Sequence, residues 1–307
     1  MKITYTRGED KHLKAIVALF ELCLFKQGGS PSVEFWKWKH HENPAGVSPI
    51  ILAWDCDRLI GIRAFMRYSF MNNHKELSCY RAVDTAIHPA YRGRGIFTKL
   101  TMQLVQQLAE TATNNFIFNT PNEKSKSGYL KMGWEVWGKP TVFLWPYLNF
   151  NPFLNNDNDI KALATFNFET ISTKKTDQFV IYKDKSYFKW RYQDIPIKKY
   201  GLTQFNNGNQ HLVVIYHKIR RGLFAENRIC DIIKNNEAVN SLTNKECRLL
   251  SRKLKGHFIT YISSAKLGAG FSIQKWAPEI TYRNFQSNAK KYKMDEFNFN
   301  LAELELF

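Results

Sequence analysis

Residues 88–100, HPAYRGRGIFTKL, constrain the fold of this chain more than any other segment of similar length. They follow the apolar, β-prone run LSCYRAVDTAI and lead into a helix predicted over about residues 96–111, where apolar residues recur at spacings of three and four. Pro89 ends strand pairing, and Gly93 and Gly95 allow backbone conformations that a Cβ would prevent. The segment therefore predicts a tight strand-to-helix turn, which could serve as a plain connection, a basic nucleic-acid patch or a phosphate cradle.

A phosphate cradle is the favoured interpretation of this turn. Backbone N–H groups at the start of a helix have no partner within the helix, and the helix dipole makes them attractive to anions. A P-loop would need Lys-Ser or Lys-Thr after the glycines, and a dinucleotide-binding turn would need a third glycine where the chain has Thr98. Nucleic-acid segments of the RGG type are repeated, whereas this copy is single. The predicted cradle comprises Arg92, Gly93, Arg94, Gly95, Ile96 and Phe97.

The composition restricts the class of protein and its partners. The 44 Lys and Arg against 27 Asp and Glu give a formal charge of +17, which attracts nucleic acid, anionic lipid or phosphorylated small molecules. Five scattered cysteines without a CxxC pair predict neither a disulfide framework nor a zinc site. No apolar run approaches the roughly 18 residues of a membrane span, and the N-terminus has no apolar signal core. We therefore expect a globular cytoplasmic protein without a metal.

The order of predicted elements indicates an α/β fold with a mixed sheet, in which antiparallel strands come first and a strand-helix-strand unit follows. An Asn- and Asp-rich linker over residues 149–159 separates a predicted domain 1–148 from a predicted domain 149–307. FWKWKHHENP (35–44) is echoed by YFKWRYQDIP (187–196), which favours a duplicated domain. The second half has no RGRG segment, so we expect it to be a degenerate copy with a structural or substrate-shaping role.

The strand-to-helix turn resembles motif A of the GNAT acyltransferases, whose signature is [QR]-x-x-G-x-[GA]. Arg92, Gly95 and Ile96 match the motif in place, whereas Phe97 stands where the family usually has Gly or Ala. Acetyltransferases of the enhanced-intracellular-survival type, which carry tandem GNAT domains, look similar in having a bulky residue at this position. The resemblance implies a GNAT fold with two tandem GNAT-like domains, the second one degenerate.

A second motif follows at the spacing of the same family. NEKSKSGYLKMGW is similar to motif B, with Asn122, Tyr129, Gly133 and Trp134 in the corresponding positions, and it follows motif A by about 30 residues. The two motifs together are more specific than either one alone. The resemblance covers roughly residues 1–146 and says little about the rest of the chain.

The resemblance also implies the chemistry. Acetyl-CoA would donate the acyl group, with its pyrophosphate on the cradle and its pantetheine between the strands RAVDTAI and NFIFN. Main-chain groups of Thr85, Ala86 and Ile87 would hold the pantetheine and the thioester carbonyl. The acceptor amine attacks directly, and Tyr129 protonates the departing thiolate. Tyr129 could instead be a packed helix residue, and Asn122 is either a contact of acetyl-CoA or a cap of the helix that follows it.

The general base stays open. Strand alternation places Asp84 on the same face as Ala82 and Ala86, where it could take the proton of the amine, although it could equally be satisfied by local hydrogen bonds. The resemblance to the enhanced-survival enzymes offers the carboxylate of Phe307 as an alternative, because FNFNLAELELF is predicted to be a terminal strand. Water is the third candidate.

These observations predict an N-acetyltransferase that transfers acetyl from acetyl-CoA to a primary amine of a small molecule. The positive charge mildly favours an anionic acceptor, although coenzyme A accounts for part of that charge. Two other hypotheses are a basic module that binds nucleic acid or anionic surfaces on a GNAT scaffold, and an aminoacyl or long-acyl transferase. The identity of the acceptor and the oligomeric state cannot be read from the sequence.

Overall fold

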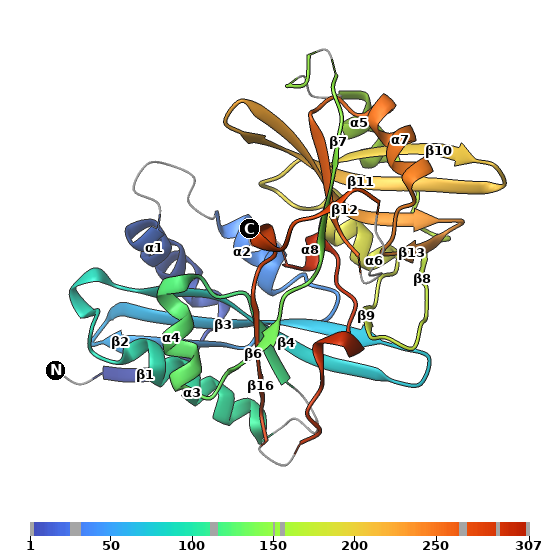
Figure 1. Cartoon of the computed structure of the whole chain (residues 1–307). Helices are drawn as coiled ribbons and strands as arrows, with labels where there is room; N and C mark the ends of the chain where they lie inside the picture. Colours follow the sequence, from blue (N-terminus) through green and yellow to red (C-terminus); the bar gives the residue numbers. More distant parts are fainter. Residues whose placement is uncertain are drawn as a thin grey trace. The chain divides into compact units, whose positions relative to one another are not determined.

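A computed structural model of the chain describes residues 3–24, 32–110, 116–149, 151–153, 157–263, 269–286 and 289–304. Two compact units make up the molecule, and each contains one mixed β-sheet (Figure 1). The first unit consists of residues 1–69, 77–137 and 280–292, and the second of residues 70–76, 138–279 and 293–307.

The first unit has the predicted order of elements, with its strands in the sheet order β1-β2-β3-β4-β5-β16-β6. β1 and β2, and β2 and β3, pair antiparallel, whereas β4 and β5 are parallel. The elements are β1 (Ile3–Arg7), α1 (Leu13–Leu24), α2 (Val33–His40), β2 (Ile50–Asp55), β3 (Arg58–Met71), β4 (Glu76–Ile87), α3 (Ile96–Ala109), β5 (Phe116–Asn119), α4 (Glu123–Lys131), β6 (Glu135–Gly138) and β16 (Ile280–Asn284).

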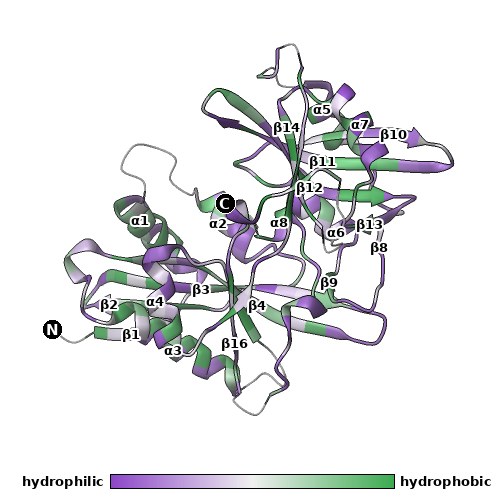
Figure 2. Ribbon diagram, viewed as in Figure 1, coloured by the Kyte–Doolittle hydropathy of each residue, from purple (hydrophilic) through white to green (hydrophobic). Residues whose placement is uncertain are grey.

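The apolar stripe of α3 builds the core that holds the predicted turn in place. Leu100 and Leu104 of α3 are buried and cluster with Ile51 and Ala53 of β2, together with Tyr129 of α4. Their spacing of four residues places both leucines on one face of the helix, as expected for a helix that covers a sheet. Figure 2 shows the hydrophobic stretch of β2 against which this face packs. The helix predicted from residue 96 is confirmed and ends at Ala109.

The second unit has the sheet order β10-β11-β12-β14-β7-β15, with β12 and β14 parallel and the pairs β10–β11 and β11–β12 antiparallel. A helix covers one face of this sheet, because buried residues of α7 cluster with those of β11, β12 and β14. The elements are β7 (Val142–Pro146), α5 (Asp157–Thr165), β8 (Ser172–Thr173), β9 (Val180–Ile181), α6 (Lys185–Phe188), β10 (Gly201–Asn207), β11 (Gln210–Arg221), β12 (Phe224–Lys234), β13 (Glu237–Val239), α7 (Asn244–Lys253), β14 (Phe258–Ile262), β15 (Phe271–Ser272) and α8 (Leu301–Leu304).

The two units share one topology and exchange a strand. In each unit a parallel strand pair, β4–β5 or β12–β14, is joined by a helix and bordered by one antiparallel strand. That strand is β16 for the first unit, although it follows β10 to β15 in the chain, and it is β7 for the second unit, although it precedes β10 to β15. The predicted single cut between residues 148 and 149 therefore differs from this division. Local patterns show that a segment is a strand but not which sheet it joins.

The sequence echo lies on matching helices. Residues 35–44 include most of α2, and residues 187–196 include the end of α6 and a following π-helical turn (Lys189–Gln193). Both helices begin with a side-chain cap, Ser32 for α2 and Asp184 for α6. The shared topology and this correspondence agree with the predicted duplication.

The predicted terminal strand is wrong within the described residues, because Phe297 makes only an isolated bridge to Phe179 and residues 301–304 form the short helix α8. Asn300 donates its backbone N–H to the Glu303 carboxylate at 2.7 Å, which satisfies an amide at the start of this helix. A glutamate in an alternating strand is expected to face solvent, but Glu303 is buried beside Lys183. Phe307 and its carboxylate lie outside the described residues.

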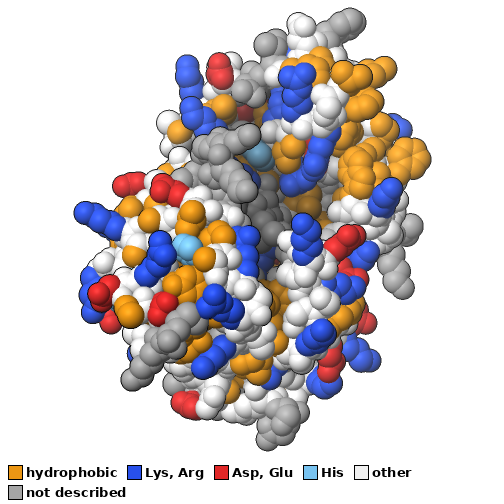
Figure 3. Space-filling view, turned by 90° about the vertical axis from the view of Figure 1, so that its left-hand side faces the viewer, with side chains coloured by type: hydrophobic (Ala, Val, Ile, Leu, Met, Phe, Trp, Pro, Cys, Tyr) orange, Lys and Arg blue, Asp and Glu red, His pale blue; other side chains and the backbone are white. Residues whose placement is uncertain are grey.

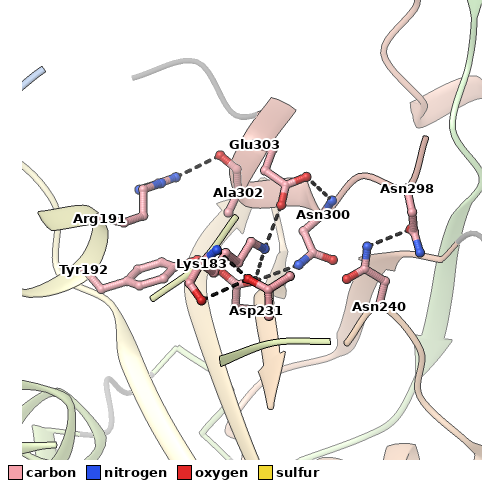
Figure 4. Close-up of polar contacts among 10 residues, drawn as sticks. Lys183, Arg191, Tyr192, Asp231, Asn240, Asn298, Asn300, Ala302 and Glu303 are labelled. Atoms are coloured by element: carbon pink, nitrogen blue, oxygen red, sulfur yellow. Dashed lines mark hydrogen bonds and ion pairs between the residues drawn. The ribbon is translucent and has the colours of Figure 1, made fainter. Parts of the chain in front are cut away.

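A buried ionic network anchors this end of the chain to the second unit (Figure 4). Lys183 Nζ lies 2.5 Å from Asp231 Oδ1 and 2.6 Å from Glu303 Oε1, and all three side chains are buried. Asn300 Nδ2 donates to Asp231 at 2.6 Å, and the Tyr192 hydroxyl donates to the other carboxylate oxygen. Burial and the charge of Asp231 raise the pKa of Glu303, against the opposing effect of Lys183.

Replacing Lys183 by methionine is expected to lower the free energy of unfolding by about 3–5 kcal/mol, because two buried carboxylates lose their cation. The loss should grow as the pH rises from 5 to 8, since the carboxylates can relieve it only by staying protonated. Lys185→Met is the matched control, because the Lys185–Glu169 pair is exposed and worth at most about 1 kcal/mol. Urea unfolding measures both variants, and equal stabilities would contradict the anchoring role.

Candidate active site

The turn between β4 and α3 has the backbone that the glycines predict. Gly93 and Gly95 have φ angles of 76° and 72°, in the left-handed region that glycine tolerates best. A Cβ built on either glycine would meet no atom within 4 Å, so the space above the turn is open. The glycines are therefore needed for the backbone conformation, and they leave the main chain accessible to a ligand.

The start of α3 presents its amides without a side-chain cap. Gly95 is the residue that precedes the helix, and within the described residues no side chain accepts from the first amides. Arg92 donates from Nε to the Ile87 carbonyl at 3.2 Å, and Arg94 stacks 5.1 Å above the ring of Tyr91. Residues 92–95 are exposed, so two cations stand beside open amides. This arrangement fits an anion.

The pairing of β4 with β5 ends several residues before β4 does, and we call the unpaired region beside β4 the opening between the two strands. The parallel ladder joins only Tyr80 to Ile117 and Arg81 to Phe118, whereas β4 continues to Ile87. The predicted contact residues Thr85, Ala86 and Ile87 lie in this continuation of β4. Their main-chain groups on the side of β5 have no ladder partner within the described strands. A ligand that enters there can use these groups.

Tyr129 reaches the same region from α4. Asn122 caps this helix, because its Oδ1 accepts from the Ser125 amide at 2.9 Å. Tyr129 is 5% exposed and packs edge-on against Phe97, with a centroid distance of 5.5 Å, and against Trp134, at 5.3 Å. Its hydroxyl accepts a hydrogen bond from Arg63 Nη2 at 2.7 Å. The structure therefore brings Phe97 of motif A and Tyr129 of motif B into contact.

Asp84 does not follow the predicted strand alternation. Its φ of 34° interrupts the alternation of β4, so that Ala82 packs in the cluster around α3 while the Asp84 carboxylate contacts α2. Asp84 Oδ2 lies 2.7 Å from Lys39 Nζ and 2.9 Å from His40 Nε2. The predicted common face with Ala82 is therefore wrong. A single left-handed residue in a strand reverses the facing of the residues beside it.

The charge state of this group follows from its partners. Burial would raise the pKa of Asp84, but the Lys39 ammonium and the hydrogen bond from His40 hold it well below its ordinary value. Burial lowers the pKa of His40, against the effect of Asp84, so the ring is neutral at pH 7 and donates from Nε2. His40 Nδ1 is buried and has no hydrogen-bond partner within the described residues. Asp84 is therefore an ionised, well-held carboxylate.

The lowered pKa of Asp84 sets a pH dependence of stability. A carboxyl group whose folded pKa lies below its ordinary value of 3.8 stabilises the fold fully above that pH, and the contribution declines below it and is lost only as the pH falls through the lower folded pKa. Asp84→Asn is expected to cost about 2 kcal/mol at pH 7 and somewhat less at pH 3. Urea unfolding at the two pH values measures this. Asp10→Asn, at an exposed carboxylate near His41, is the control and should change little.

Sequence reasoning missed three residues of the site: Arg63, Lys39 and His40. Arg63 interrupts the apolar run LIGIRAFM of β3, and a charged residue in such a run is the signal that could have found it. Lys39 and His40 lie in the aromatic and basic run FWKWKHHENP, and the structure shows that both are buried.

The second unit keeps part of the arrangement and lacks the cradle. In the register of the echo Tyr192 corresponds to His40, and Tyr192 hydrogen-bonds to Asp231 of β12 as His40 does to Asp84 of β4. The helix after β12, α7, is capped by Thr243, and the Glu246 carboxylate accepts the Thr243 amide at 2.7 Å. A capped helix start that already carries a carboxylate has no place for a phosphate.

Three further observations bear on ligands. Within the described residues no group of three His, Cys, Asp or Glu side chains could hold a metal ion. No helix in the described ranges is long and apolar enough to cross a membrane. On the face drawn in Figure 3, Lys and Arg side chains are scattered among hydrophobic and acidic ones and do not merge into one basic patch.

Comparison with known proteins finds a family model that matches most of the first unit. Residues 4–137 match the family model described as "Acetyltransferase (GNAT) domain". No curated protein shows significant similarity to the chain.

Solved structures resemble the chain over most of its length at low sequence identity. They include a probable N-acyltransferase from Enterococcus faecalis (TM-score 0.62, 13% identity, 92% of this chain and 73% of that one). A GCN5-related N-acetyltransferase from Anabaena variabilis has a TM-score of 0.60 and 14% identity over 93% of this chain and 73% of that one. Eis1 from Mycobacterium abscessus has a TM-score of 0.52 and 10% identity over 85% and 65%. These likenesses concern the fold and include both units.

Proposed function

Because residues 4–137 match a family model described as a GNAT acetyltransferase domain, we propose that the protein transfers acetyl from acetyl-CoA to the primary amine of a small molecule. The open amide cradle at the start of α3 is the observation that carries this proposal. Two left-handed glycines keep side chains away from it, and two arginines stand beside it. Pyrophosphate is the anion that such a cradle suits best.

Different residues around the cradle bind different parts of acetyl-CoA. The amides and side chains of residues 92–97 hold the pyrophosphate, and the main chain of Thr85, Ala86 and Ile87 binds the pantetheine in the opening beside β5. Asn122 Oδ1 is engaged by Ser125, so a contact of Asn122 with acetyl-CoA would use its Nδ2. The second unit, whose α7 is capped, binds no acetyl-CoA of its own and shapes the acceptor site.

The reaction needs one new bond and two proton movements. The amine nitrogen attacks the thioester carbonyl, the carbon–nitrogen bond forms and the carbon–sulfur bond breaks. Tyr129 gives its hydroxyl proton to the departing thiolate, and the amine nitrogen releases one proton. A carboxylate with a lowered pKa is a weak base, so we assign Asp84 the role of attracting the amine. We assign to water the role of accepting the proton that the amine nitrogen releases. The carboxylate of Phe307, the other candidate base, belongs to the residues that are not described.

A panel of amines tested for thiol release from acetyl-CoA examines the proposal directly. We expect at least one small amine to accelerate thiol release with saturation kinetics, and mass spectrometry should show the acetylated amine. The panel should include anionic amines, because the charge of +17 favours them, and matched neutral amines as controls. Saturable binding of acetyl-CoA without acetylation of any amine would contradict the proposed transfer. A longer acyl-CoA in the same assay tests the acyl chain length.

The charge of +17 supports a second candidate, a basic module that binds polyanions. Such binding depends steeply on salt and would not compete with acetyl-CoA. Titration of a labelled oligonucleotide at moderate salt, with and without acetyl-CoA, separates the two candidates. We expect no tight binding at moderate salt that acetyl-CoA leaves unaffected.

A further inference from the structure

Arg63 of β3 is a buried cation without an anion. Its side chain is 2% exposed, and no Asp or Glu of the described residues forms an ion pair with it. Its Nε is buried and has no hydrogen-bond partner there. Burying a charge without a counter-charge costs free energy, so such a residue is seldom kept for stability alone. The contacts of Arg63 indicate its function.

The Arg63 guanidinium connects the three parts of the candidate site. Nη2 donates to the Tyr129 hydroxyl at 2.7 Å, and Nη1 donates to the Thr85 hydroxyl and, at 3.3 Å, to the Val83 carbonyl. The guanidinium carbon lies 5.5 Å from the ring centroid of Tyr129 and 5.8 Å from that of Phe97. One cation thus touches the motif B tyrosine, the continuation of β4 and the motif A phenylalanine.

We propose that Arg63 is the positioning residue for proton transfer by Tyr129, an inference that rests on the proposed function. A phenol oxygen has one proton and two lone pairs, so a hydroxyl that accepts from Arg63 directs its proton away from the guanidinium. When the proton moves to the thiolate sulfur, the phenol oxygen becomes an anion beside a guanidinium at 2.7 Å. Tyr129 then regains a proton, through water, from the amine nitrogen. No oxidant or further reactant is needed.

The same arrangement explains the departure from motif A. Phe97 stands where the family usually has Gly or Ala, and its ring packs on both Arg63 and Tyr129. Together with Phe65, whose centroid lies 4.9 Å from the guanidinium carbon, it covers the cation. Aromatic faces attract a guanidinium and exclude water, which strengthens the hydrogen bond to Tyr129. A glycine or alanine at position 97 would leave the cation less well enclosed.

Arg63→Met and Arg63→Lys test the proposal, with Arg67→Met as the matched control. Arg67 lies on the same strand and donates to a buried tyrosine, Tyr80, at 3.3 Å, but Tyr80 is not part of the site. We expect Arg63→Met to lower kcat about 100-fold, with KM for acetyl-CoA changed less than about 3-fold. Arg63→Lys should recover part of the rate, and Arg67→Met should keep it.

A purely structural role would give different results. Removing an uncompensated buried charge should leave stability in urea unchanged or higher, whereas a structural residue would lower it. The double variant Arg63→Met, Tyr129→Phe should be no slower than Tyr129→Phe alone, because Arg63 acts through that hydroxyl. An additive loss of rate, or a kcat of Arg63→Met within about 3-fold of wild type, overturns the proposal. If the wild-type protein acetylates no amine, the proposed function fails together with the role of Arg63. If the wild type is active and only the Arg63 variants depart from expectation, the role of Arg63 alone fails.

Discussion

Replacing Gly95 by valine is expected to abolish saturable binding of acetyl-CoA at concentrations where the wild-type chain is saturated. Gly95 has a φ of 72°, which a β-branched residue adopts only under strain of about 1–3 kcal/mol. The new side chain would also occupy the open space through which a phosphate approaches the amides of α3. Loss of two charge-assisted hydrogen bonds corresponds to an affinity loss of roughly 100-fold or more. Isothermal titration calorimetry measures it.

Gly222→Val is the matched control for this substitution. Gly222 also has a positive φ, 58°, and a Cβ there would meet no atom within 4 Å, but it lies in the turn between β11 and β12. Both variants should lose similar stability, and only Gly95→Val should lose acetyl-CoA. Equal loss of binding in both variants would mean that strain, and not the cradle, is being measured.

Tyr129→Phe is expected to lower kcat by about 10²–10⁴-fold, because the departing thiolate loses its proton donor. The affinity for acetyl-CoA should change less than about 3-fold, since the ring keeps its packing against Phe97 and Trp134. The rate is measured as amine-dependent thiol release.

Tyr80→Phe controls for the loss of a buried phenol hydroxyl. Tyr80 is 3% exposed, belongs to the same core cluster and accepts from Arg67, but it is not part of the proposed site. It should retain nearly full activity. If Tyr129→Phe is as active as Tyr80→Phe, Tyr129 is only a packed helix residue.

The local parts of the site could be predicted from the sequence. The turn, α3 and α4 depend on glycine conformation, apolar spacing and an Asn cap, which are properties of neighbouring residues. The resemblance to tandem GNAT proteins, stated from two motifs, is confirmed by the family model for the first unit and by the fold likeness for both. Two motifs at the spacing of a family indicate its fold even where few other residues match.

The parts that depend on distant contacts could not be predicted. The side chain of Asp84 faces α2 because its own backbone is left-handed and because Lys39 and His40 of α2 hold its carboxylate. The exchange of β7 and β16 depends on which sheet edge each strand joins. The helix at residues 301–304 depends on the burial of Glu303 beside Lys183. In each case a tertiary contact overrides the pattern of the segment itself.

A crystal structure of the chain with coenzyme A tests the central claim most directly. We expect the diphosphate to lie against the main-chain amides that begin α3, with the sulfur in the opening between β4 and β5 on the side of Tyr129. Coenzyme A bound elsewhere, or a start of α3 that stays closed by the protein's own side chains at saturating coenzyme A, would contradict the claim.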